Sequence, residues 1–185
     1  MYRLKLFLAI FIIALTSELS SQVQSRCGDA ALPVQARLLI KKRFPGWRIK
    51  LPSDLVDFDK RAYAQDHPEE CPGIAVGHFE DPSTKGYGLL LIPISAPENG
   101  SKIVVLSKDA NSDGYSARVL AHAENQPGAS SGLVISKVPP GKYPGFDTTQ
   151  AVRLKLDGLE AEWLEKSSVL YYWRNGKYRT LQTSD

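Results

Sequence analysis

The sequence predicts an α+β fold in which one or two N-terminal helices pack on a mostly antiparallel β-sheet. Three observations support this class. Helical spacing of apolar residues is confined to the N-terminal third, short apolar runs of strand type begin near residue 74, and two turn pairs, Asp157-Gly158 and Asn175-Gly176, are typical of tight hairpins. The remaining length after a leader, residues 26–185, suits one domain.

Residues 1–25 are predicted to be a signal peptide. Arg3 and Lys5 precede an apolar run at 6–15, and a polar stretch follows at 16–25. The run is short for a bilayer span, so we expect cleavage between residues 16 and 26 and no stable membrane anchor afterwards. The alternative is an uncleaved anchor. The predicted localisation is secreted or periplasmic.

The chain has two cysteines, Cys27 and Cys71. Export favours a disulfide between them, because oxidising compartments preserve such bonds. The alternative is a catalytic thiol. It lacks a CxxC spacing and a nearby His–Cys pattern, so the disulfide is the prediction.

A helix is predicted over residues 32–44. Pro33 suits its first turn, and Val34, Leu38 and Leu39 lie near one face, which we expect to be buried. Pro45-Gly46 ends it, and a short extended piece follows at 47–49.

A second helix is predicted within residues 52–65. Ser53 or Asp54 would cap it, and Leu55 and Phe58 keep helical spacing.

The remaining segments are predicted strands. Residues 87–94 form a nearly continuous apolar run, typical of a central strand covered on both faces. The others are residues 73–79, 102–108, 115–123, 132–138, 151–156, 159–165, 168–173 and 177–183. The second half is therefore expected to form an antiparallel meander. Its loop richest in proline and glycine is predicted at residues 139–147.

The stretch from residue 107 to 120 resembles half of a calcium-binding loop. Asp109, Asn111 and Asp113 occupy alternate positions and Gly114 follows, but Leu120 stands where such a loop needs a bidentate carboxylate. We therefore expect a hairpin turn and no assigned metal ligands. Weak calcium binding by the three polar residues stays open.

A second segment resembles the FG-GAP type found singly in secreted bacterial proteins of unassigned function. The matching residues are Gly77, Phe79, Glu80, Tyr87 and the apolar run 89–91. In that family the carboxylates form a calcium-binding turn, so the resemblance implies a strand–turn–strand unit.

This chain departs from that pattern at the metal ligands. His78, Pro82 and Gly86 stand where three Asp would be, and Glu80 keeps an acidic side chain. The resemblance therefore favours the strand–turn–strand fold. The substitutions at the ligand positions mean that most of the family's metal site is missing from this chain.

Aromatic residues gather near the C-terminus. In a strand, Tyr171 and Trp173 would share one face and Tyr172 the other, with Tyr178 across the Asn175-Gly176 turn. Such pairs commonly stabilise sheets, which is the favoured interpretation. The alternative is an aromatic binding surface.

Familiar catalytic patterns are missing from the sequence. It has neither a GxSxG elbow nor a phosphate-binding GxxxxGK[ST] loop, and His67, His78 and His122 are isolated along the chain. No catalytic residue and no cofactor is assigned.

The formal net charge is +3, without a cluster of cations and aromatics of the kind that favours nucleic acid. We predict a non-catalytic binding or interaction module for a protein or cell-envelope partner. The alternatives are a hydrolase with a spatially assembled site, or a vestigial calcium-stabilised module.

Overall fold

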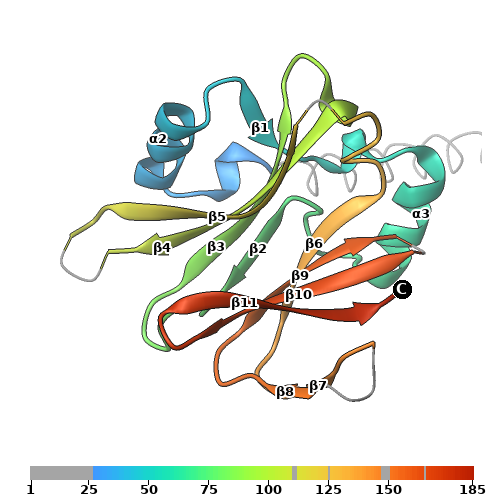
Figure 1. Ribbon diagram of the computed structural model, residues 1–185. Helices are drawn as coiled ribbons and strands as arrows, with labels where there is room; N and C mark the ends of the chain where they lie inside the picture. Colours follow the sequence, from blue (N-terminus) through green and yellow to red (C-terminus); the bar gives the residue numbers. More distant parts are fainter. Residues whose placement is uncertain (1–26, 110–111, 125, 147–150, 165) are drawn as a thin grey trace, which may run out of the picture.

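The computed structural model describes residues 27–109, 112–124, 126–146, 151–164 and 166–185. The predicted signal peptide and Asn111 lie outside these residues. The α+β class is confirmed: the described chain has two α-helices, short 3-10 turns and eleven strands in antiparallel sheets (Figure 1). The helices are α2 (Val34–Arg43) and α3 (Asp57–Asp66). The strands are β1 (Trp47–Ile49), β2 (Ile74–Gly77), β3 (Gly86–Pro93), β4 (Gly100–Lys108), β5 (Tyr115–Glu124), β6 (Leu133–Val138), β7 (Lys142–Pro144), β8 (Ala151–Arg153), β9 (Gly158–Trp163), β10 (Ser167–Arg174) and β11 (Lys177–Ser184).

The strands form two main sheets and a small hairpin. The first sheet has the order β1-β3-β4-β5, and β2 also pairs with β3. The second sheet has the order β11-β10-β9-β6, and β7 pairs with β8 apart from both. Strands β9, β10 and β11 form the expected meander, and a hydrogen bond from Ile135 N–H to the Pro72 carbonyl joins the two sheets beside β2.

The nearly continuous apolar run at residues 87–94 forms most of strand β3. Leu89 and Leu91 pack in the cluster that α2 covers, whereas Leu90 faces the second sheet. All three are fully buried. Because both faces of the strand are covered, neither set of alternate side chains can be polar without a buried partner. The predicted central strand is confirmed.

The buried face of α2 differs from the prediction. Val34 and Leu38 are 54% and 62% exposed, and the helix packs through Ala36 and Ile40. These two residues continue a row four residues apart that includes Leu32 and Phe44. Residues four apart lie on one helical face, and the small Ala36 lets this face approach the sheet closely.

The start of the second helix was also predicted wrongly. A 3-10 turn covers Pro52–Asp54, and α3 begins only at Asp57. Asp54 is not a cap of α3, because its carboxylate accepts two hydrogen bonds from Arg48 at 2.6 Å each. Phe58 is 56% exposed, and Tyr63 is the side chain of α3 that packs against the second sheet.

Asp157-Gly158 is not a hairpin turn. Gly158 opens β9 with β6 and β10 beside it, and Asp157 accepts the backbone N–H of His78 at 2.7 Å. A Cβ at Gly158 would lie 2.6 Å from a methyl carbon of Leu170, so glycine serves close packing at this position. The predicted loop 139–147 also contains a strand, β7.

The Cys27–Cys71 disulfide is present, with the two Cα atoms 5.5 Å apart. It joins the start of the described chain to the segment before β2. The closed loop contains both α-helices and β1. Neither α2 nor α3 is long and apolar enough to cross a membrane, and they are the only α-helices in the described residues.

Candidate binding site at the β10–β11 hairpin

The tip of the β10–β11 hairpin is built by Asn175 and Gly176. Their φ angles are 53° and 77°, the left-handed values that a type I′ turn requires at both central positions. Directly behind the turn, Trp173 pairs with Tyr178, and their rings meet edge-on with centroids 5.0 Å apart. The predicted turn and cross-strand aromatic pair are both confirmed.

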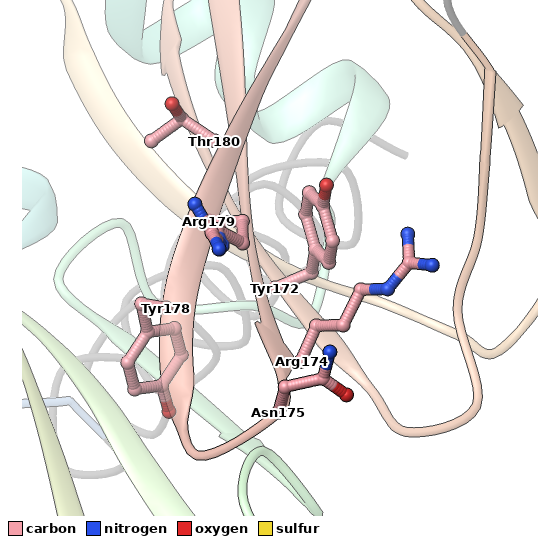
Figure 2. A pocket seen from close by; sticks show the side chains of 6 residues that line it. All are labelled: Tyr172, Arg174, Asn175, Tyr178, Arg179 and Thr180. Atoms are coloured by element: carbon pink, nitrogen blue, oxygen red, sulfur yellow. The ribbon is translucent and has the colours of Figure 1, made fainter.

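A depression of about 610 Å³ lies on this hairpin (Figure 2). Tyr172 and Arg174 project from one side of β10, and Tyr178 projects from the other side of the hairpin. Arg179 lies opposite Tyr172 in the strand register, so the two side chains share a face. The described residues that line it are Tyr172, Arg174, Asn175, Tyr178, Arg179 and Thr180.

A second depression of about 800 Å³ adjoins the first and lies between β10 and the segment of β8. It shares Tyr172 and Arg174 with the first and adds Arg153 and Lys155. Among the residues that the structure describes, no Asp or Glu lines either depression. We call Arg153, Lys155, Tyr172, Arg174 and Arg179 the basic hairpin surface.

The four cations of the basic hairpin surface are exposed, and none forms an ion pair with a described carboxylate. Several cations on other strands are paired, as with Arg48 and Asp54, Lys102 and Glu124, or Arg118 and Glu80. Like charges gathered around one depression repel each other, and a bound anion reduces this electrostatic repulsion.

A third depression lies at the turn between β2 and β3, the segment that resembles FG-GAP. Its acidic side chains are already engaged. Glu80 accepts from Arg118 at 3.1 Å, and Asp81 accepts the backbone N–H of Ser83 at 2.7 Å. Hydrogen bonds from Ser83 lower the pKa of Asp81 below its usual range. Arg118 also lies 5.3 Å from the Trp173 ring centroid, which links this turn to the hairpin.

The stretch that resembles half of a calcium-binding loop connects β4 to β5 in a hairpin, as predicted from the sequence. The backbone N–H of Asp109 donates to the Gly114 carbonyl at 3.0 Å, and Asp113 lies 3.4 Å from the Lys108 ammonium. The flanks are strands. Among the described residues, no three His, Cys, Asp or Glu side chains are placed to hold a metal ion.

The three histidines lie apart, each beside a different carboxylate. His67 is 3.3 Å from Glu70, and His122 is 3.3 Å from Glu124. His78 lies 3.5 Å from Asp157, which unlike Glu70 and Glu124 is a buried carboxylate, as the acid of a Ser-His-Asp triad is. In the described part of the chain, no Ser, Thr or Cys side chain is hydrogen-bonded to His78.

A buried lysine was not anticipated from the sequence. Lys50 is 1% exposed, and its ammonium donates to the carbonyls of Ser130 and Leu133 at 2.5 and 2.8 Å. Burial lowers its pKa to about 8, against the opposing field of Asp54 and Asp59. The enclosed ammonium is hydrogen-bonded at the junction between the sheets, so it is not accessible to a ligand on the surface.

The basic hairpin surface was only partly visible in the sequence. The aromatic residues and the turn were recognised, but Arg153 and Lys155 are about twenty residues away along the chain. Only the fold of the β7–β8 segment brings them beside Tyr172. Alternation along β10 could have placed Tyr172 and Arg174 on one face, and the pairing to β11 could have added Arg179.

Comparison of the chain with protein-family models, with curated proteins and with solved structures gives no match. The resemblance to the FG-GAP type therefore stays a prediction, and the functional argument rests on the geometry of this chain alone.

Proposed function

We propose that this protein is an exported, non-catalytic binding module that takes an anionic partner of the cell envelope on its basic hairpin surface. The observation that carries the proposal is the gathering of four cations around Tyr172 in two adjoining depressions. Within the described part of the chain, none of the four has an ion-pair partner and no acidic residue lines either depression. Guanidinium groups bind carboxylates and phosphates through paired donors, and an aromatic ring offers an apolar face beside them.

Two features of the fold support a binding role. The Asn175-Gly176 turn and the Trp173–Tyr178 pair hold the hairpin in one shape, so little ordering accompanies binding. The Cys27–Cys71 disulfide is a bond that a chain in an oxidising compartment would retain, which agrees with the predicted export.

The proposal is tested by removing charge at two places. Arg174→Ala/Arg179→Ala should bind poly-L-glutamate about tenfold more weakly than the natural protein, because two surface ion pairs of roughly 0.7 kcal/mol each are lost. Lys41→Ala/Lys42→Ala, on α2, removes the same charge and should bind like the natural protein. Fluorescence anisotropy with labelled poly-L-glutamate measures both. Equal weakening in the two variants would show that binding follows net charge and not this surface.

A further inference from the structure

We infer that the partner binds as an extended acidic peptide that adds a strand to the outer edge of β11. This inference rests on the proposed function and specifies its partner. Among the described strands, the second sheet has the order β11-β10-β9-β6, so β11 pairs with β10 on one side and is an edge strand on the other. The first depression crosses that edge, since Tyr178, Arg179 and Thr180 of β11 line it.

The backbone of β11 offers hydrogen bonds at this edge. In an antiparallel strand, the N–H and C=O groups of alternate residues point to opposite sides. The Gln182 carbonyl points outward, because it accepts the N–H of Phe146 at 2.8 Å. Tyr178 and Thr180 belong to the same alternate set. No backbone hydrogen bond from another described segment reaches either residue.

Side chains beside this edge select the partner's charge. Lys177 and Arg179 share a face of β11 and lie opposite Arg174 and Tyr172 of β10. An added strand places alternate side chains on that same face, and opposite charges on neighbouring strands attract. The fitting segment therefore carries carboxylates at alternate positions. A second copy of this chain is disfavoured, because edge-to-edge pairing would bring Lys177 and Arg179 against their own copies.

The first experiment follows backbone protection in the natural protein. The probe is a synthetic peptide of alternating Glu and Thr, and the control is a peptide of alternating Glu and Pro with the same charge. We expect the Glu-Thr peptide to slow amide hydrogen exchange at Tyr178 and Thr180, because these groups then donate to the added strand. Proline breaks strand pairing, so the Glu-Pro peptide should leave both amides exchanging as in the free protein.

The second experiment removes one donor from the edge. Thr180→Pro lacks the outward N–H but keeps every bond to β10, and Thr180→Ala keeps the N–H. The Glu-Thr peptide should bind Thr180→Pro about tenfold more weakly than Thr180→Ala, because a main-chain hydrogen bond is lost. The melting temperatures of both variants establish that they are folded. The exchange measurement needs no variant and decides the matter if Thr180→Pro does not fold.

Three results would overturn the inference. Peptide binding with unchanged exchange at Tyr178 and Thr180, and equal affinity in both variants, would leave the proposed function standing without strand addition. Binding of a heparin oligosaccharide but not of the Glu-Thr peptide would replace the peptide with an acidic glycan. Failure of the natural protein to bind the peptide, poly-L-glutamate or heparin would overturn the proposed function as well.

Discussion

Reduction of the Cys27–Cys71 disulfide is expected to lower the free energy of unfolding by about 4 kcal/mol, on a chain-entropy account of the loop it closes. The two cysteines are 44 residues apart in sequence, and the intervening chain contains α2, β1 and α3. Without the bond, the unfolded chain gains conformational freedom while the folded chain keeps its packing. The loss is a large part of the stability of a domain this size.

Urea unfolding with and without a reducing agent measures this effect. The Cys27→Ser/Cys71→Ser variant should unfold at the same urea concentration as the reduced natural protein and should not respond to reductant. Coincident unfolding curves for oxidised and reduced natural protein would contradict the expectation and would mean that the bond adds nothing to the fold.

Raising the pH from 7 to 9.5 is expected to increase the contribution of Lys50 to the free energy of unfolding by about 2 kcal/mol. This value follows from the difference between the pKa of Lys50 in the folded chain and in the unfolded chain. Burial lowers the pKa of Lys50 from 10.5 to about 8. Between these values the unfolded chain binds more protons than the folded one, so the free energy of unfolding rises with pH. Below about pH 8 the group is protonated in both states and the gain is absent.

The Lys50→Met variant isolates this contribution, because methionine is an unbranched side chain that does not titrate. We expect urea unfolding at the two pH values to give a rise for the natural protein that exceeds that of Lys50→Met. Measurements stop below pH 10, because burial raises the pKa of Tyr63 and Tyr178 and their opposing contributions begin there. Parallel pH profiles for the two proteins would show that Lys50 titrates alike in the folded and unfolded states.

The parts of the fold that follow from local pattern were predicted from the sequence. Burial on both faces makes the apolar run of β3 continuous, and this composition is visible without knowing what covers it. The Asn175-Gly176 turn was predicted because few residues adopt positive φ twice in succession. The disulfide pairing followed from there being two cysteines and a leader that suggests export.

The parts that depend on distant neighbours were not predicted. Apolar residues surround α2 on more than one side, so its periodicity could not say which side meets the sheet. Asp157-Gly158 has the composition of a turn, but a hydrogen bond to His78 and contact with Leu170 decide its conformation. Arg153 joins Tyr172 only through tertiary structure, and for that reason the basic hairpin surface could not be assembled from spacing.

The central claim is that anions bind at the basic hairpin surface, and an NMR titration with poly-L-glutamate tests it most directly. Backbone amide and arginine side-chain signals are followed in the natural protein as the polyanion is added, at low and at high salt. We expect the largest shifts at Arg153, Arg174 and Arg179, and we expect salt to suppress them because exposed charges are screened. Shifts centred on Lys41 and Lys42 of α2, with the hairpin signals unmoved, would contradict the account.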